Sequence, residues 1–575
     1  MNKNILHTVK GVAGCLLMAS LAAGCAQEDI GTVPTGGMSP TSYVSLSFAS
    51  PQGTPTRSNP TGGEKGDGLE AGQDNENVIT SAVAFFYQGS GADGVNSDGS
   101  TQIMAVATFN VGSPTEPGNG IDRTYTTTPQ QVDLENGTYN VIVVANPGAD
   151  WWTGKSLTLA EVRDHIQTTA WTASGSDYSD FVMTSAADAM LTLNSNPESN
   201  PATAEVDVER MAARLDYKAE ASYTCTDPKY SGATVEITGA ALVNNLTAGS
   251  YLLKRVADDV NGVPTYLGNE TPDAGVQTNY VLDPWTAGKT SANNSFTIGG
   301  EANKTAKDLY GEWFGNISQD PNYWAAYVQP GTSVSDGWQR IGYTLENTTA
   351  AEEAGKRYST GVVFKAKFHP QGVANYEDGA TFFALGTHLF ASMENMMTYV
   401  YGADFSQFDD KIDACTDWAS VKTFAASLLD NDPSGYKTFL QGQDDTQDLA
   451  QVKESLKWKA YMFSNWGYSA SLNNNVYSVI LDQNEDISTR EALQSYGTRT
   501  YEDATCYYTW WVRHSNDNND DAKGIMEYAI VRNNIYKLTV NSVYSLGGEV
   551  PEDESLIVDV YVNDWLLLDP ETLPM

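Results

Sequence analysis

Two segments near the ends of the chain alternate between apolar and polar residues, the pattern of a strand that buries one face. In the first, residues 41–50, the alternation places on the buried face Val44, Leu46 and Phe48. In the second, residues 556–567, it places there Leu556, Val558, Val560 and Val562. We expect both segments to be half-buried strands.

The apolar runs between these two segments predict a mainly β protein. Val78–Tyr87 and Tyr139–Ala145 are apolar on both faces, as expected of central strands in a sandwich. Further strands are predicted over residues 206–217, 234–246, 360–368, 507–513 and 527–543. Apolar residues recur at helical spacing over 418–428 and 449–463, which predicts a helical insertion in the second half of the chain.

The first 24 residues have the three parts of an export signal. Lys3 and Lys10 supply positive charge, residues 12–21 form an apolar stretch too short to span a bilayer, and small residues precede Cys25. We expect Cys25 to carry a lipid, so that residues 1–24 are a lipoprotein signal peptide. A plain secretory peptide is the alternative.

Arg57 is an isolated basic residue in the N-terminal arm. No Lys or Arg occurs between Lys10 and Arg57, so Arg57 is the one position there that an arginine- or lysine-specific protease can cut. Residues 52–75 are rich in Gly, Pro, Thr and Asp, which predicts an exposed flexible loop. The strand predicted over 41–50 precedes Arg57, so cleavage there separates it from the rest of the chain.

The charge of the chain excludes two classes of partner. The 575 residues include 33 Lys and Arg against 72 Asp and Glu, which gives a formal net charge of −39. Nucleic acids and anionic membranes are bound by cationic faces. We therefore expect neither as a binding partner.

The cysteines do not define a disulfide framework. After the signal, three remain at wide spacing: Cys225, Cys415 and Cys506. Three widely spaced cysteines can form one disulfide and leave one buried thiol, or they can all be buried thiols. The second arrangement is favoured.

No pattern of catalytic residues emerges. The four histidines after the signal are far apart in sequence and belong to neither an HExxH nor a GxSxG motif. They are His165, His369, His388 and His514. The Asn and Asp residues over 516–521 lack EF-hand spacing and are typical of a solvated loop. We predict no enzyme activity, no catalytic residue, no metal and no cofactor.

Several short motifs carry a resemblance to a known family. Residues 526–538 read MEYAIVRNNIYKL and resemble the C-terminal signature of the Bacteroidales fimbrillins, the type V pilins. Supporting motifs occur in family-like order: ENGTY at 135–139, VERMAARL at 208–215, DPW at 283–285 and YTLENT at 343–348. The resemblance covers nearly the whole chain and is closest to the major subunit of the short, or minor, fimbria.

The resemblance implies a fold and a route of assembly. It implies two transthyretin-like β-sandwich domains, placed here at 58–212 and 213–575, the second with the helical insertion. Residues 25–57 then form a lipidated propeptide that an arginine-specific surface protease removes between Arg57 and Ser58. The strand with Val44, Leu46 and Phe48 leaves, and a neighbour's C-terminal strand enters, carrying Leu556, Val558, Val560 and Val562.

The function implied is that of a structural subunit of a cell-surface fimbrium that supports adhesion. Its expected partners are further copies of itself, accessory fimbrial subunits, the protease, and receptors on host or bacterial surfaces. The precursor is expected in the outer membrane of a Gram-negative bacterium, held by its lipid. The alternatives are an accessory anchor or tip subunit of the same fimbria, or a glycan-binding surface lipoprotein.

Overall fold

The computed structural model describes most of residues 41–390 and 498–566. Within these spans it leaves out residues 50–64, 90–98, 114–124, 176, 259–262, 267–279, 286–294, 299–300, 306–307, 309, 315–319, 349–357, 515–526 and 552–555. Between them it describes only residues 391–392, 395–396, 399, 414–420, 423 and 448–450. Cys25, Arg57, Ser58 and the polar run 516–521 therefore lie outside the described residues. The protein is mainly β, as predicted.

The N-terminal part of the chain forms a curled sheet with the order β4-β3-β7-β11-β13-β1-β5, in which β12 also pairs with β7 and β6 with β1. The bounds of its strands are β1 Ser42–Ala49, β3 Ser81–Tyr87, β4 Ala105–Asn110, β5 Tyr125–Thr126, β6 Gln130–Val132, β7 Gly137–Ala145, β11 Met183–Ser185, β12 Ala189–Leu193 and β13 Ala202–Arg210. The sheet curls at β13, which pairs with β1 over residues 202–207 and with β11 over 208–210.

The centre of this sheet is buried on both faces, which explains the apolar runs of β3 and β7. Ala84 and Val143 face one core together with Val44, Leu46 and Phe48. Phe85 faces the opposite core, which is completed by residues from 246–358. Strands covered on both sides need apolar residues at every position, so their sequence loses the simple alternation of period two.

The C-terminal part of the chain forms a sandwich of two sheets. One has the order β2-β31-β30-β14-β24-β23 and the other the order β15-β16-β25-β29. The bounds are β2 Lys65–Ala71, β14 Ala213–Lys218, β15 Tyr223–Thr224, β16 Thr234–Val243, β23 Thr332–Ser333, β24 Gln339–Thr344, β25 Gly361–His369, β29 Thr505–Trp511, β30 Asn534–Val543 and β31 Leu556–Leu566. Leu538 and Val560 from the first sheet meet Phe364 and Cys506 from the second in one core.

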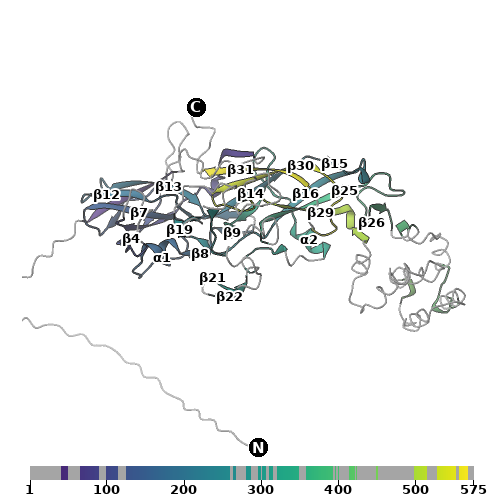
Figure 1. The fold of residues 1–575 in the computed structure, drawn as a ribbon, viewed down its shortest axis with the longest axis horizontal. Helices are drawn as coiled ribbons and strands as arrows, with labels where there is room; N and C mark the ends of the chain where they lie inside the picture. The colour runs from purple at the N-terminus through teal and green to yellow at the C-terminus, as the bar shows by residue number, and fades with distance from the viewer. Residues whose placement is uncertain are drawn as a thin grey trace, which may run out of the picture. The chain divides into compact units, whose positions relative to one another are not determined.

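In Figure 1, β7, β12 and β13 lie toward one end of this body and β16, β25 and β29 toward the other, with β14 and β31 between them. Smaller elements complete the described chain. They are β8 Ile166–Gln167, β17 Ser250–Tyr251, β9 Thr172–Ser174, β10 Asp177–Ser179, β18 Arg255–Asp258, β19 Val263–Tyr266, β20 Tyr280–Val281, β21 Ser295–Ile298, β22 Glu301–Thr305, β26 Phe382–Leu385, β27 His388–Phe390, β28 Thr498–Tyr501, and the helices α1 Leu159–Arg163 and α2 Pro321–Tyr327.

Two strands have other bounds in the structure than the sequence predicted. The single strand expected over 206–217 is broken between β13 and β14, where Asn533 accepts a hydrogen bond from the Arg210 N–H at 3.0 Å and donates one to the Ala212 carbonyl at 2.9 Å. The strand expected over 527–543 begins only at Asn534. Asn533 has a φ of 56°, a turn conformation that ends any strand before it.

The predicted flexible loop over 52–75 is wrong for its C-terminal part. Residues 65–71 form β2, which pairs in parallel with β31, and residues 74–76 form a short 3-10 helix. Their Gly and Asp content favours a loop in isolation. Backbone partners on β31 and ion pairs of Glu70, described below, outweigh that preference.

The predicted helical insertion lies mostly outside the described residues. Residues 418–420 are helical, and Trp418 is buried, but the remainder of 421–428 is described only at residue 423. The segment predicted over 449–463 is described only at its first two residues, which are helical.

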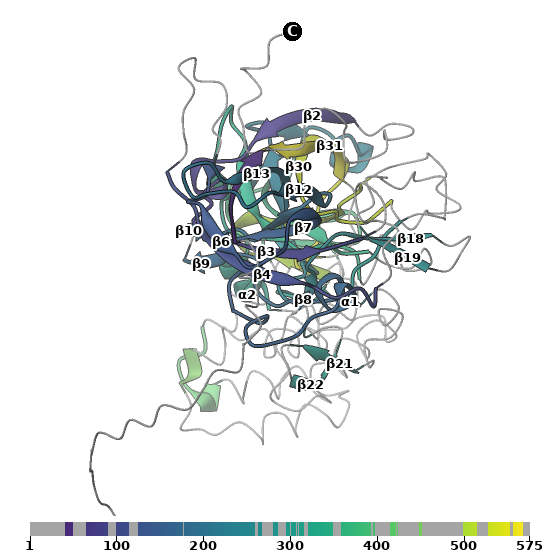
Figure 2. The same ribbon diagram turned by 90° about the vertical axis from the view of Figure 1, so that its left-hand side faces the viewer.

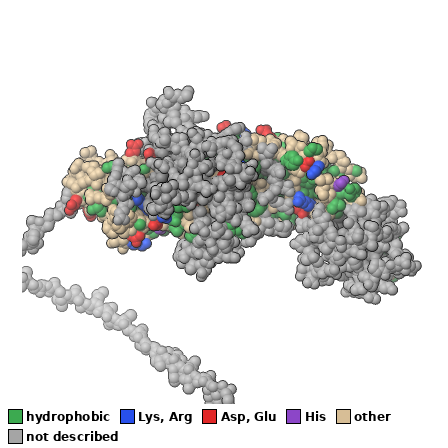
Figure 3. All heavy atoms as spheres, viewed as in Figure 1, with side chains coloured by type: hydrophobic (Ala, Val, Ile, Leu, Met, Phe, Trp, Pro, Cys, Tyr) green, Lys and Arg blue, Asp and Glu red, His purple; other side chains and the backbone are tan. Residues whose placement is uncertain are grey.

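The three mature cysteines are buried thiols, as favoured from the sequence. Burial raises the pKa of the Cys225 thiol to about 11, with a smaller contribution from the charge of Asp227. Within the part of the chain that the structure describes, no helix is both long and apolar enough to cross a bilayer. On the face shown in Figure 3, acidic and basic side chains are scattered among uncharged ones.

Candidate strand-exchange site

β1 is an internal strand of the N-terminal sheet. On one side it pairs in parallel with β13, from Val44 opposite Ala202 to Ala49 opposite Asp207. On its other side it pairs antiparallel with β6 and then with β5. Both edges of β1 are therefore hydrogen-bonded within the same chain.

The apolar face of β1 is completely buried. Val44, Leu46 and Phe48 are each 0% exposed and belong to the core that fills the curled sheet. Full burial of three side chains of this size contributes roughly 5–9 kcal/mol before entropy is counted. The alternation in the sequence predicted this face, and the structure confirms its burial.

The opposite face of β1 carries a polar contact that the sequence did not indicate. The Ser45 hydroxyl donates a 2.9 Å hydrogen bond to the Thr127 carbonyl, and the Leu46 N–H donates one of 2.9 Å to Thr127 Oγ1. The Thr127 N–H in turn donates to the Leu46 carbonyl at 2.9 Å. Thr127 and Ser45 are both buried, so these bonds are shielded from water.

Removal of β1 leaves a gap in the middle of the sheet. The facing edges of β13, β5 and β6 lose their hydrogen-bond partners, and the core loses three large apolar side chains. Unpaired strand edges beside exposed apolar surface readily accept another strand. The arrangement can therefore hold either its own first strand or an extended segment from elsewhere.

β31 carries the second set of predicted residues and is also an internal strand. It pairs antiparallel with β30, from Val543 opposite Leu556 to Asn534 opposite Asp564. Its other edge pairs in parallel with β2, which lies beside it in Figure 2. In this structure the strand belongs to the sandwich of its own chain.

The apolar face of β31 is buried in the C-terminal core. Val558, Val560 and Val562 are 7%, 1% and 0% exposed. The side chain of Leu556 lies outside the described residues, although its backbone pairs with Val543. The structure thus brings each predicted set into a core, but it places the two sets in different sheets.

Glu70 fixes β2 to this sheet. Its carboxylate accepts a bond from Arg214 at 2.9 Å, from Lys537 at 2.7 Å and from the Asn563 amide at 3.2 Å. The first residue lies on β14, the second on β30 and the third on β31. One side chain of β2 therefore joins three neighbouring strands.

A buried ionic cluster lies where the two parts of the chain meet. The Arg214 guanidinium donates to Glu76 at 2.9 Å and to Asp216 at 2.8 Å, besides its bond to Glu70. Arg214, Glu76 and Asp216 are all 0% exposed. Burial alone lowers the pKa of Arg214, but the nearby carboxylates of Asp216 and Glu76 outweigh it and raise that pKa.

Arg210 and Tyr343 extend the cluster. Tyr343 donates to Glu76, and the Arg210 guanidinium donates to the Glu76 carbonyl at 3.1 Å and to the Asn77 side chain. Burial lowers the pKa of Arg210 to about 9. Arg210 and Arg214 belong to the VERMAARL motif at 208–215, which predicted no role for either side chain. The charge of Arg210, Arg214 and Glu209 in a motif whose other residues are apolar is the signal that could have indicated buried ion pairing.

Comparison with known proteins identifies the C-terminal region. Residues 499–570 match the family described as major fimbrial subunit protein type IV, fimbrillin, C-terminal. The matched segment contains β30 and β31. None of the curated proteins compared with the chain matches it.

Solved structures of similar proteins include three from the Bacteroidales. A candidate cell adhesion protein from Parabacteroides distasonis ATCC 8503 is 11% identical, with a TM-score of 0.40, over 91% of this chain and 100% of that one. The tip fimbrial protein Mfa3 from Porphyromonas gingivalis is 8% identical, with a TM-score of 0.31, over 92% and 100%. A fimbrilin, FimA, from P. gingivalis W83 is 13% identical, with a TM-score of 0.32, over 91% and 98%.

At TM-scores this low, these likenesses carry no argument about the chain. The family match does, and it falls on the segment whose motif carries the strongest resemblance in the sequence. It does not single out the short-fimbria group. The resemblance to the Bacteroidales fimbrillins is thereby confirmed, and the chain carries a fimbrillin C-terminal region at residues 499–570.

Proposed function

We propose that this chain is the precursor of a fimbrial shaft subunit that polymerises by exchange of β1 for a strand of the next subunit. The observation that carries the proposal is the position of β1. It is an internal strand, yet it lies N-terminal to Arg57, and the sequence has no other Lys or Arg between Lys10 and Arg57. Cleavage between Arg57 and Ser58 leaves β1 attached by noncovalent contacts alone.

The proposal divides the chain into parts with separate tasks. Residues 1–24 direct export, Cys25 carries the lipid, and residues 25–57 form the propeptide. The two sandwich domains comprise 58–212 and 213–575. Glu70 and Glu76, which follow the cut, form ion pairs with Arg214 at the beginning of the second domain, so the new N-terminal segment stays attached to the subunit after cleavage.

The donor in this account is β31, with Leu556, Val558, Val560 and Val562. Because β31 is paired on both edges within its own sheet, donation requires it to leave β30 and β2. Its valines move from one apolar core into another, so their burial contributes little net free energy. The exchange pairs the edges left by β1 and leaves β30 and β2 without β31, so it exchanges one gap for another within the polymer.

The partners follow from this assembly. They are other copies of the chain, accessory fimbrial subunits, an arginine-specific surface protease, and receptors on host or bacterial cells. The precursor resides in the outer membrane of a Gram-negative bacterium through its lipid, and the processed subunit in the fimbrium. The motif order favours the major subunit of the short fimbria, with a structural and adhesive role and no catalysis.

Limited digestion of the purified precursor with an arginine-specific protease tests the proposal. We expect cleavage after Arg57 to convert the monomer into a polymer that resists sodium dodecyl sulfate. Arg57→Ala is the matched control, which should remain monomeric under the same treatment. Protein that is cut after Arg57, has lost residues 41–50 and still stays monomeric would contradict the proposal.

A further inference from the structure

β2 connects the two strands of the proposed exchange. It is the next strand after β1 along the chain, and Arg57 lies on the segment that joins the two. β2 is also the edge strand of the six-stranded sheet and pairs with the edge of β31 that β30 leaves open. One strand therefore contacts the proposed donor and is tied covalently to the strand that cleavage removes.

Backbone pairing alone holds β2 weakly. Its pairs with β31 are parallel and shift register between Gly66 and Leu69, and the strand contains two glycines. Glycine weakens a strand, because it loses more backbone entropy on folding and offers no side chain to pack. β2 therefore depends on further contacts to stay in the sheet.

Glu70 supplies these contacts by reaching across β31. In the order β2-β31-β30-β14, β31 lies between Glu70 and both of its cationic partners, Lys537 on β30 and Arg214 on β14. The same carboxylate accepts a hydrogen bond from the Asn563 amide of β31. The ion pairs thus enclose β31 between β2 and β30, and β31 cannot separate from β30 without disturbing them.

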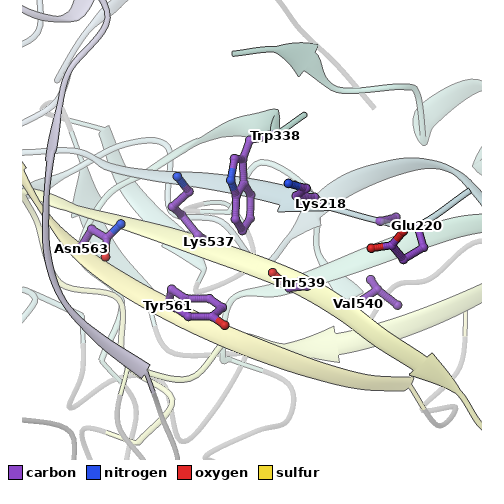
Figure 4. A pocket seen from close by; sticks show the side chains of 9 residues that line it. Lys218, Glu220, Trp338, Lys537, Thr539, Val540, Tyr561 and Asn563 are labelled. Atoms are coloured by element: carbon purple, nitrogen blue, oxygen red, sulfur yellow. The ribbon is translucent and has the colours of Figure 1, made fainter. Parts of the chain in front are cut away.

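Trp338 holds the Lys537 side chain in position. The Lys537 ammonium lies 4.4 Å from the centroid of the indole, where the aromatic face attracts a cation. Figure 4 shows Lys537 and Asn563 at the same end of the cavity on the outer face of the sheet, with the indole between Lys537 and Lys218. Because the lysine is already ordered, its ion pair with Glu70 costs less side-chain entropy.

Two glutamates tie the segment after the cut to Arg214, and they differ in exposure. The Glu76 side chain is 0% exposed, whereas that of Glu70 is 20% exposed. Water can solvate the Glu70 carboxylate when its partners separate, so this contact opens at a small cost. The buried pair of Glu76 is far more costly to break and keeps the segment on the subunit.

We propose that β2 and the Glu70 ion pairs form a clamp that retains β31 in its own sheet, and that cleavage after Arg57 loosens this clamp. The inference rests on the proposed exchange of β1 for a donor strand. In the uncut chain β2 is held at both ends, by β1 before it and by Glu76 after it. The cut leaves a free end at Ser58, so the open state of β2 gains conformational entropy. The same cut then exposes the groove and weakens the retention of the donor strand.

Hydrogen exchange measured by mass spectrometry tests the clamp on the full chain. The cut protein receives an excess of a synthetic peptide of residues 41–50, which keeps the groove filled, and the monomeric fraction is labelled. Cut and uncut samples then differ only in the broken link. We expect the amides of β31 to exchange at least about threefold faster after the cut, and those of β25 in the opposite sheet to be unchanged. An unchanged rate in β31 would overturn the coupling to cleavage.

Glu70→Gln tests the clamp independently of cleavage. In an uncut Arg57→Ala background, we expect this variant to speed exchange in β31 about two- to fivefold, the effect of losing a partly exposed ion pair. Glu377→Gln, at an exposed glutamate outside the cluster, is the matched control. Equal rates in the two variants would refute the role of Glu70. Faster exchange in β31 without formation of polymer after the cut would contradict the proposed strand exchange but support the clamp.

Discussion

The backbone of Leu46 is bonded to Thr127 in both directions: Leu46 N–H donates to the Thr127 hydroxyl, and Thr127 N–H donates to the Leu46 carbonyl, each at 2.9 Å. These two bonds join the middle of β1 to Thr127, which directly follows β5 and precedes β6. An incoming strand must therefore offer a backbone N–H and a carbonyl at this point of the gap.

Thr127→Val keeps the shape of the side chain but removes the acceptor of the Leu46 N–H. We expect a loss of about 1–3 kcal/mol in the unfolding free energy of the precursor, because a buried donor is left unpaired. Chemical denaturation measures it. The neighbouring Thr128→Val is the control, since its exposed hydroxyl makes only a 3.4 Å bond, and should change stability by less than about 0.5 kcal/mol. Equal effects in both variants would show that the contact contributes nothing special.

A disulfide between β30 and β31 tests whether β31 must leave its sheet. Thr539 and Asp559 are directly opposite in the register, so Thr539→Cys with Asp559→Cys can link the two strands. We expect the oxidised variant to be cut after Arg57 but to remain monomeric, and reduction to restore polymerisation. Each single cysteine variant is a control. Polymer formed by the oxidised protein would assign donation to another segment.

Arg214→Met removes the cation that holds three carboxylates. Glu76 and Asp216 then stay buried without their partner, which costs about 3–5 kcal/mol of unfolding free energy. Arg214→Lys keeps the charge but lacks the planar fork, so we expect an intermediate loss. Thermal and chemical denaturation compare the variants. Wild-type stability in Arg214→Met would contradict a stabilising role of the cluster.

His165 gives the stability a defined dependence on pH. Burial lowers the pKa of His165 from 6.5 to about 4, with a smaller effect of Lys155, and the ring stacks on Trp151 at 3.8 Å. The unfolded chain therefore binds the proton more readily than the folded one. This contribution to stability is complete above pH 6.5 and is lost as the pH falls toward 4.

His165→Phe retains a stacking ring and cannot titrate. We expect the loss of unfolding free energy between pH 6.5 and 4 to be smaller in this variant than in the wild-type chain. The difference between the two stability profiles isolates the histidine from the buried carboxylates. Parallel profiles over this window would show that the imidazole is not desolvated in the folded state.

The strands that were predicted share a strong local pattern. β1 and β31 alternate cleanly, and β3 and β7 are continuous apolar runs, so the sequence suffices to place them. β2 has no such pattern. It contains two glycines, and it forms because its backbone pairs with β31 and Glu70 bonds Arg214 and Lys537.

The polar parts of the site were not predictable for a related reason. Thr127 and Glu76 are ordinary loop residues by composition, and their burial depends on contacts with residues more than eighty positions away. Likewise, the break at Met211–Ala212 follows from bonds made by Asn533, far along the chain. Local periodicity reports which face is apolar but not which distant polar group will meet it.

The measurement that tests the central claim most directly is N-terminal sequencing of subunits taken from intact polymer on the cell surface. The account predicts a start at Ser58, with residues 41–50 absent from the polymer. Subunits that polymerise while they still begin at a lipidated Cys25 and keep β1 would contradict it.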